Sequence, residues 1–198
     1  MTLIYNWILG LIILFFSKLL LLVSPDFKRK YSFLQIQISG ITCLPIPDLL
    51  SHGLIILEDR CFYKHSGFDI RSIIRAIRNN LSDGPIQGAS TIEQQLVRTL
   101  TNERKINYQR KLLEILLATL ISNRFKKKQI LDFYLNSYPF KRSIGIHNLC
   151  KNENYNIEQL TVFDISEIVA RLKYPSITQN NYLRYLKRVR TVHIKLID

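Results

Sequence analysis

Apolar residues along this chain recur mostly with a helical period, and this pattern predicts a mainly α protein. In residues 69–81 the apolar positions fall every three or four residues, which is typical of an amphipathic helix. Residues 108–122 are apolar on nearly all sides, which indicates a central, buried helix. Further helices are expected at 49–59, 91–100, 126–136, 157–172 and 179–197. No alternation of strands and helices is visible, so a parallel α/β sheet is not expected.

The first helical run is long enough to cross a membrane. Residues 3–23 are 21 residues in which Lys18 is the only charge, and about 20 apolar residues span a bilayer core. No basic start and no small-residue cleavage site are present, which favours a retained anchor over a cleaved signal peptide. A buried core helix is the alternative. We therefore expect an anchor at residues 1–25 and one body domain at 26–198.

Two short segments are predicted to be non-helical. Residues 31–42 alternate enough between apolar and polar to indicate a short strand or an extended link, which Pro45 and Pro47 would end. Ser82 to Pro85 is expected to be a loop.

Charge narrows the range of partners. The chain has 28 Lys and Arg against 15 Asp and Glu, a net charge of +13, which implies an anionic partner: nucleic acid, anionic lipid or a phosphorylated substrate. The three cysteines, Cys43, Cys61 and Cys150, lack C-x-x-C spacing, which argues against a structural zinc site and a disulfide framework.

The first motif is EDRCFYKHSG, which starts at Glu58. Two adjacent carboxylates, Glu58 and Asp59, follow an apolar run, and such carboxylates suit general acid or base chemistry. His65 is close enough in sequence to orient one of them, and Gly67 allows a sharp turn. The plain alternative is the polar end of a helix.

The second motif is GASTIEQQLVR, which ends at Arg98. Ser90 or Thr91 can cap the helix that follows, and the free N–H groups of a helix start favour phosphate. Gln94 and Arg98 lie four residues apart and share a face. A simple capped helix is the alternative.

The third and fourth motifs lie on the next two helices. Arg110 and Glu114 lie four apart on the apolar helix, where charges seldom occur unless they are paired or functional. A buried structural ion pair is the alternative. The fourth motif, KKQILDFYLN up to Asn136, is locally an amphipathic helix with a basic start.

Taken together, E-D-x-x-F-x-x-H-x-G, G-x-S-T-I-x-Q-Q, R-K-x-x-E and K-x-x-I-L-x-x-Y-L-N resemble the peptidoglycan glycosyltransferases, which polymerise lipid II. The resemblance covers roughly residues 45–190. The length and the N-terminal anchor are similar to the monofunctional branch of that family. No Ser has Lys three places on and no K-T-G occurs, so penicillin-binding transpeptidase chemistry is absent from this sequence.

The resemblance implies a lysozyme-like helical lobe with a small jaw lobe on the membrane, and an inverting transfer. The GlcNAc 4-hydroxyl of lipid II would attack a donor glycan carried on undecaprenyl diphosphate. Glu58 matches the general base and Glu114 the second essential glutamate. The residues implied in substrate binding are Ser90, Gln94, Gln95, Arg98, Arg110 and Lys111. The residues implied in structural support are Asp59, Phe62, His65, Gly67 and Asn136.

The resemblance also implies partners and a location. Partners would be lipid II, the lipid-linked glycan, the membrane and other cell-wall synthesis proteins, with no nucleic acid. Family members often respond to Mg²⁺ or Mn²⁺, but no ligand cluster in this sequence demands a metal. The body would lie outside the bacterial cytoplasmic membrane, although the basic residues Lys28 to Lys30 after the span favour the cytoplasm by the positive-inside rule.

Several positions depart from the family pattern. Arg98 stands where most members have Lys, Ile106 where Arg is usual and Ser122 where Glu is common, and the Gly-rich stretch after Asn136 is reduced. The changes at Ile106 and Ser122 motivate one alternative, a catalytically weak or inactive membrane-tethered scaffold of cell-wall synthesis. A second alternative is a lysozyme-like hydrolase that uses Glu58 as an acid on finished glycan. A nucleic-acid binder would explain the charge but neither the anchor nor the glutamates.

Overall fold

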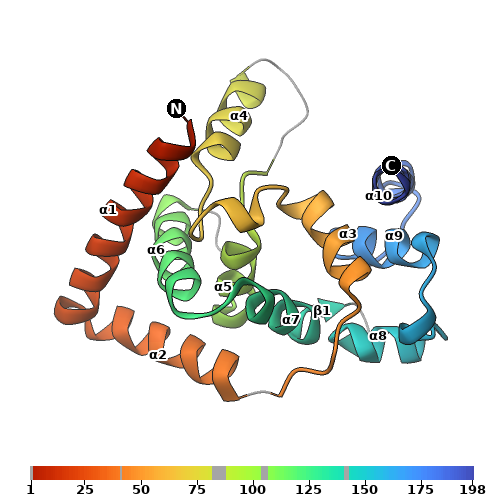
Figure 1. Cartoon of the computed structure of the whole chain (residues 1–198), viewed down its shortest axis with the longest axis horizontal. Coiled ribbons are helices and arrows are strands. Elements are labelled where there is room, and N and C mark those ends of the chain that lie inside the picture. The colour runs from red at the N-terminus through yellow and green to blue at the C-terminus, as the bar shows by residue number, and fades with distance from the viewer. Residues whose placement is uncertain (1, 41, 82–87, 104–106, 141–142) are drawn as a thin grey trace. The chain divides into compact units, whose positions relative to one another are not determined.

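A computed structural model of the chain describes residues 2–40, 42–81, 88–103, 107–140 and 143–198, and this part is mainly helical, as expected (Figure 1). The α-helices are α1 (Thr2–Val23), α2 (Pro25–Gly40), α3 (Asp48–Glu58), α4 (Ile70–Leu81), α5 (Ile92–Thr101), α6 (Tyr108–Arg124), α7 (Lys127–Ser137), α8 (Ile146–Asn152), α9 (Val162–Arg171) and α10 (Tyr182–Ile197). Short 3-10 helices lie at η1 (Phe62–Lys64) and η2 (Ile157–Gln159). The strands β1 (Pro139–Phe140) and β2 (Ser143–Ile144) form an antiparallel pair in which Phe140 lies opposite Ser143.

The chain divides into two compact units. Unit 1 is Met1–Ile41 with Cys61–Ile130, and unit 2 is Thr42–Arg60 with Leu131–Asp198. The motif that starts at Glu58 is therefore split, because Glu58 and Asp59 belong to unit 2 and the rest of the motif after Arg60 to unit 1.

Unit 1 is built around α6, against which α1, α2 and α5 pack. The inner residues Leu117 and Ile121 of α6 are fully buried. Helix α1 contacts α6 through a small residue, because the Ser17 hydroxyl donates to the Leu116 carbonyl at 3.2 Å. The large apolar side chains on the rest of α1, such as Trp7 and Leu22, are exposed. Helix α1 thus has a packed side with small residues and an apolar side that faces outward.

The anchor expected at residues 1–25 corresponds to α1. Among the described residues, none of the helices taken alone combines the length and the hydropathy of a membrane span. Residues 7–23 of α1 and helix α2 reach them only as a pair, which is bent by 110°.

The short strand or extended link expected at residues 31–42 is wrong, because this segment lies mostly in α2. Its buried residues Phe27, Leu34 and Ile38 are seven and four apart, which is a helical spacing. The alternation also included Ile36, which is 67% exposed. The apolar residues of this segment fit both the strand period of two and the helical period of 3.6. Packing of one side of the helix against α1, α5 and α6 selects the helix.

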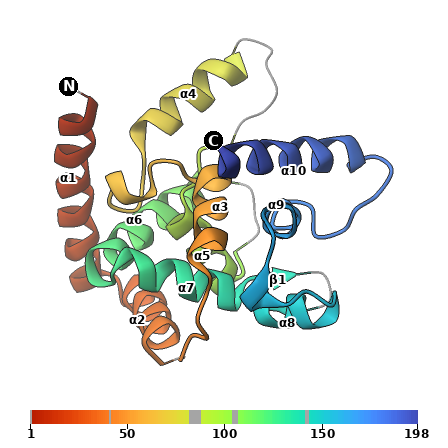
Figure 2. The same cartoon turned by 45° about the vertical axis from the view of Figure 1, so that its right-hand side comes forward.

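Unit 2 is held together by the mutual packing of α3, α9 and α10 (Figure 2). Gly53 on α3 allows close approach to α9, since a Cβ there would lie 3.0 Å from Ile165 Cγ2. Helix α9 starts with a capping box in which Thr161 and Asp164 bind each other's backbone N–H groups. The helix expected at 157–172 is therefore shorter than predicted, because Ile157–Gln159 form a separate 3-10 turn and Thr161 caps the start of α9.

The other predicted helices are confirmed to within about three residues at each end. The helix at 108–122 is only partly buried, however: Tyr108 is 95% exposed, and continuous burial starts near Glu114. The loop expected at Ser82 to Pro85 lies outside the described residues.

Candidate functional site

The Glu114 carboxylate is surrounded by three cationic side chains on α5 and α6. The side chain of Glu114 is 2% exposed. Arg98 donates to both carboxylate oxygens, from Nε to Oε1 at 2.8 Å and from Nη2 to Oε2 at 3.2 Å. Arg110 Nε lies 3.3 Å from Oε1 and Lys111 Nζ lies 3.6 Å from Oε2. One carboxylate therefore faces three cations, and this group, which we call the Glu114 cluster, keeps an excess of positive charge.

The local sequence explains how these side chains meet. Asn107 caps α6 by accepting a hydrogen bond from the Arg110 backbone N–H at 2.7 Å. Positions three and four apart on a helix share a face, which places Arg110 and Lys111 beside Glu114. Thr91 caps α5, whose packing against α6 brings Arg98 to the same carboxylate. The predicted cap at Ser90 or Thr91 is confirmed for Thr91.

Ser90 and Gln94 join the same network. The Ser90 hydroxyl accepts hydrogen bonds from Lys111 Nζ at 2.9 Å and Arg98 Nη2 at 3.1 Å. Gln94 Oε1 accepts from Lys111 Nζ at 2.6 Å, and Gln94 Nε2 donates to the Gly67 carbonyl at 3.0 Å. Five of the six residues predicted to bind substrate thus share one network with Glu114. Gln95, the sixth, follows Gln94 on α5 and is partly buried.

Burial lowers the pKa of Lys111 below its ordinary value, and the nearby Arg98 and Arg110 act in the same direction, while Glu114 opposes them. The ammonium group therefore loses its proton at a lower pH than an exposed lysine would. An anion bound beside Lys111 would favour the charged form, so the cluster is suited to gaining a negative ligand.

The part of the first motif in unit 1 forms a turn that supports α5. Gly67 has φ +91°, and a Cβ there would lie 2.5 Å from the Ala118 carbonyl oxygen, so the position requires glycine. Its carbonyl accepts hydrogen bonds from Thr91 Oγ1 and Gln94 Nε2. The Gly67 N–H donates to His65 Nδ1 at 3.2 Å, and His65 is buried. These contacts connect the first motif to the second.

Phe62 and Glu93 lie in the same unit and contact the same lysine. The Lys127 ammonium lies 4.4 Å from the centre of the Phe62 ring, a cation–π geometry, and also pairs with Glu93. Glu93 is fully buried, and the sequence prediction missed it. The sequence did hold one indication of a buried carboxylate: Glu93 directly follows Ile92 in the first turn of α5, among residues that are otherwise apolar or amide and buried.

In unit 2, Glu58 is the last residue of α3 and forms an ion pair with Arg188 on α10. The two side chains are 15% and 17% exposed, so both are largely buried. The neighbouring Asp59 is also buried, and its N–H donates to the Ile55 carbonyl at the end of the helix.

Sequence reasoning also missed Arg188. The only local signal is that Arg188 is next to the apolar stripe of α10, formed by Tyr185, Val189 and Val192, while most other basic residues of that helix are exposed. A single sequence cannot link it to Glu58, which lies 130 residues earlier.

Asn136 joins two segments of unit 2. Its Nδ2 donates to the Leu44 carbonyl at 3.1 Å and to the Asp132 carbonyl at 2.8 Å. Gly145, with φ +79°, lies directly against it, since an added Cβ would be 2.2 Å from the Asn136 carbonyl oxygen. These contacts hold α7, the segment before α3 and the turn at Gly145 together.

A divalent cation does not fit the Glu114 cluster. Mg²⁺ and Mn²⁺ take carboxylate, carbonyl and water oxygens. The one carboxylate of this cluster already faces three cationic groups, so we derive no step through a metal there. Of the departures from the family pattern, Ile106 lies outside the described residues, as do residues 141–142 of the shortened stretch.

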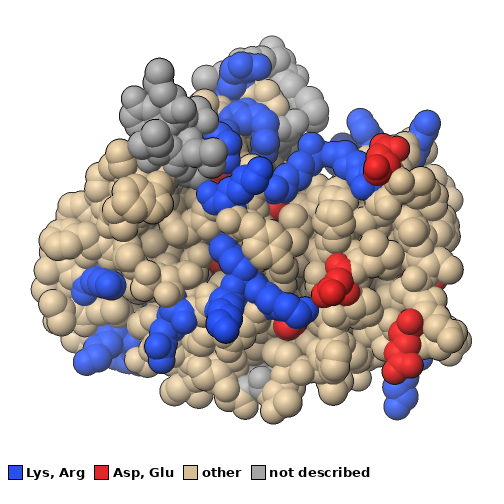
Figure 3. All heavy atoms as spheres, viewed as in Figure 1, with Lys and Arg blue, Asp and Glu red and all other residues tan. Residues whose placement is uncertain are grey.

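Basic side chains are prominent on the described surface. On the face seen in Figure 3, Lys and Arg predominate among the charged side chains. The sequence gives the same sign, with a net charge of +13.

Comparisons with known proteins identify the family and several relatives of this chain. A family model described as "Transglycosylase" matches residues 34–196. The chain is 36% identical over 161 residues to a penicillin-binding protein 1A of Rickettsia bellii. This match covers 77% of the chain and 20% of that protein. They are 31% identical over 159 residues to a monofunctional glycosyltransferase of Staphylococcus epidermidis, a match covering 74% of this chain and 58% of that protein. A monofunctional glycosyltransferase of Staphylococcus haemolyticus is 30% identical over 142 residues, covering 67% of this chain and 52% of that protein.

Proposed function

The chain belongs to the transglycosylase family, and from this premise we propose that it polymerises lipid II into glycan strands. The observation that carries the proposal is the Glu114 cluster, in which one buried carboxylate orients three cations and leaves positive charge for a ligand. This charge lies on the second and third motifs, where the family resemblance places the donor diphosphate.

In the proposed reaction, the 4-hydroxyl of the acceptor GlcNAc attacks the anomeric carbon of the donor sugar. The bond from that carbon to the diphosphate oxygen breaks, and undecaprenyl diphosphate leaves. Glu58 takes the hydroxyl proton as general base, a role worth about 10²- to 10⁴-fold in rate. Its ion pair with Arg188 supports this assignment, because the guanidinium fixes the direction of the carboxylate.

The Glu114 cluster would stabilise the leaving diphosphate. Negative charge grows on that group as the bond breaks, and preorganised cations stabilise it without further rearrangement. Arg98, Arg110 and Lys111 are held in place by Glu114, while Ser90 and Gln94 direct the Lys111 ammonium. In this proposal Glu114 acts through the cations that it positions.

Arg98 keeps the charge that the family resemblance leads one to expect from a lysine, but it has a different geometry. Its guanidinium binds both oxygens of Glu114, which a lysine ammonium does not do in the same planar way. We propose that this fork fixes Glu114 more rigidly and leaves Lys111 as the more mobile donor to the diphosphate.

A lipid-linked substrate also implies a membrane location. We propose that residues 1–25 act as the anchor and residues 26–198 as the glycosyltransferase domain, on the outer side of the bacterial cytoplasmic membrane. The exposed apolar residues of α1 support an attachment to lipid. Tethering would raise the effective concentration of a substrate confined to the same membrane.

The test uses the purified full chain in detergent with fluorescently labelled lipid II. We expect polymer on a gel and release of undecaprenyl diphosphate. Lipid II that stays unchanged, while circular dichroism shows the helical fold, would contradict the proposal and favour the scaffold. Digestion of finished peptidoglycan without polymer formation would instead favour the hydrolase.

A further inference from the structure

Helix α10 has a packed side and an outward side in unit 2 (Figure 2). Its residues Tyr185, Val189 and Val192 are buried, and the helix packs against α3 and α9. The outward side carries large apolar residues that stay exposed, which are Tyr182, Leu183, Leu186, Ile194 and Ile197. Leu183 is 79% exposed and Ile197 is 66% exposed. One exposed leucine is ordinary, but a row of large apolar side chains along one helix marks a contact surface.

The spacing of these residues places most of them on one stripe. Positions 183, 186, 190, 194 and 197 follow one another at steps of three or four residues, so they share one side of the helix. We call these five positions the α10 stripe. Four of them are apolar, and Arg190 occupies the middle of the stripe. The stripe is therefore an apolar surface with a cation at its centre.

The cations on the outward side are available to an anionic partner. Arg184, Lys187 and Arg190 are exposed, and none of the three forms an ion pair within the part of the chain that the structure describes. The helix itself contains no Asp or Glu. Arg188 differs from these residues, because it is largely buried and pairs with Glu58. The outward side thus keeps positive charge that no described carboxylate balances.

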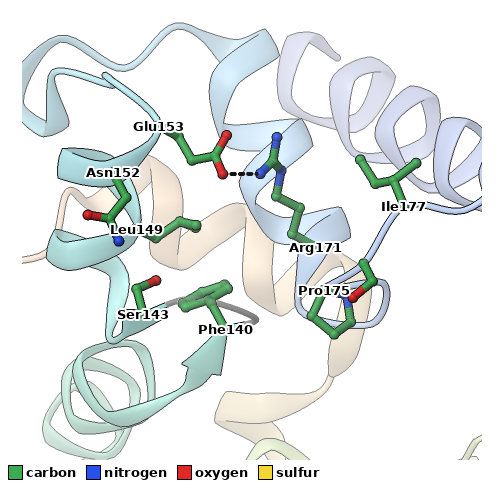
Figure 4. A pocket seen from close by; sticks show the side chains of 9 residues that line it. Phe140, Ser143, Leu149, Asn152, Glu153, Arg171, Pro175 and Ile177 are labelled. Carbon is green, nitrogen blue, oxygen red and sulfur yellow. Dashed lines mark ion pairs between the residues drawn. The ribbon is translucent and has the colours of Figure 1, made fainter.

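A cavity of about 400 Å³ elsewhere in unit 2 lacks this free charge (Figure 4). Arg171 is the one cation among its lining residues, and its Nη1 lies 3.1 Å from Glu153 Oε1, as the dashed line marks. This cation is already balanced by a carboxylate. Between the two features, the outward side of α10 is therefore the better surface for an anion.

We propose that the outward side of α10 lies on an anionic lipid surface, with the helix axis parallel to the membrane. The apolar residues of the α10 stripe would enter the boundary between headgroups and acyl chains, and the neighbouring cations would reach the phosphates. A protein helix would need an acidic side chain opposite Arg190. A lipid surface accepts this residue without a matched partner, because the long side chain extends to the headgroups.

This contact goes beyond the anchor proposed at residues 1–25. The anchor belongs to unit 1 and α10 to unit 2, so each unit would have a lipid contact of its own. The inference rests on the proposed function only in that a membrane lies beside the chain. Anionic headgroups attract clustered Lys and Arg, so this contact weakens as salt increases.

The test places a single tryptophan on the α10 stripe of the full chain. Trp7, the one tryptophan of the sequence, is replaced by Phe, and Leu183→Trp or Ile194→Trp is added. The matched control is Ile144→Trp, on β2 of the same unit, where the native side chain is 66% exposed. Each variant is reconstituted in phosphatidylglycerol vesicles whose acyl chains carry bromine, which quenches tryptophan on contact. Circular dichroism checks the fold.

We expect the fluorescence of L183W and I194W to fall severalfold relative to vesicles without bromine, and that of I144W to change little. An in-plane helix buries its apolar side about 5–10 Å into the lipid, which brings the stripe to the bromine. Replacement of Arg184, Lys187 and Arg190 by Gln in the L183W chain should restore much of the fluorescence, because these cations hold the helix at the anionic headgroups.

Fluorescence of L183W and I194W that bromine leaves unchanged, in chains that stay with the vesicles, would overturn the inference and leave the stripe to a protein partner. Equal quenching of I144W would also overturn it, because closeness of the whole unit to lipid would then be the cause. A quenched L183W chain that makes no polymer would contradict the proposed function alone. Polymer formation without quenching would contradict this inference alone.

Discussion

The two glutamates proposed for the reaction occupy very different surroundings. Glu114 is 2% exposed, and three cations from α5 and α6 lie within 3.6 Å of its carboxylate. Glu58 is 15% exposed and ends α3, and its ion pair is with one arginine of α10. Glu114 is thus the centre of a local network in unit 1. Glu58 instead belongs to an ion pair in unit 2 whose two members are far apart in the sequence.

A shared residue type therefore does not imply a shared role. A carboxylate surrounded by several cations is best suited to positioning them, because any proton it gained would break several ion pairs. A carboxylate at the end of a helix that a guanidinium orients is better suited to exchange a proton with substrate. We therefore expect substitution of Glu58 to lower mainly the polymerisation rate, and substitution of Glu114 to lower the free energy of unfolding as well.

The largest effect is expected for Glu58→Gln on activity. The amide keeps the shape but accepts a proton far less readily, so the polymerisation rate should fall by about 10²- to 10⁴-fold. The measurement is the initial rate of polymer formation from labelled lipid II, with thermal unfolding as a check of folding. A folded variant within threefold of the wild-type rate would remove Glu58 from the role of base.

Glu114→Gln should affect stability more than Glu58→Gln does. It leaves three cations without their buried counter-charge, and breaking a buried pair on one side costs about 3 kcal/mol. The same change at Glu58 strands one arginine and should cost about 1 kcal/mol. Urea unfolding of both variants gives the comparison. If both variants lost the same free energy of unfolding, the Glu114 cluster would be no more tightly coupled than the Glu58–Arg188 pair.

Arg188→Lys tests whether the partner of Glu58 acts by orientation. Lysine keeps the charge but not the planar fork, so we expect about a tenfold fall in kcat with KM nearly unchanged. Arg190→Lys, an exposed position on the same helix, is the control and should behave as wild type. A change in KM alone would instead place Arg188 in substrate binding.

The smallest effect concerns the pH dependence of the Glu114 cluster. Because burial lowers the pKa of Lys111, inorganic pyrophosphate should bind a few-fold more weakly as the pH rises through that lowered pKa, below the usual 10.5. Between the two values the unfolded chain binds more protons, so the contribution of Lys111 to folding stability rises with pH. Lys111→Arg should abolish the alkaline loss of binding in calorimetric titrations. If the loss persists in that variant, another group is responsible.

Much of the local structure could be predicted from the sequence. The spacing of apolar residues predicted α4, α5, α6 and α7 to within two residues, because a helix depends on neighbours three and four apart. The same reasoning failed for α2, whose residues fit two periods. It also overextended α9, because the capping pair Thr161 and Asp164 was not recognised as a helix start.

For the candidate site, the Arg110–Glu114 pair and a cap at Ser90 or Thr91 followed from sequence alone, since both lie within about one turn of a helix; the structure selects Thr91 as the cap. Only the tertiary structure decided that Arg98 reaches across from α5 to Glu114, and that Glu58 takes Arg188 as its partner. The physical reason is range: contacts within a helix follow from its repeat, whereas contacts between helices depend on how all their buried faces pack at once.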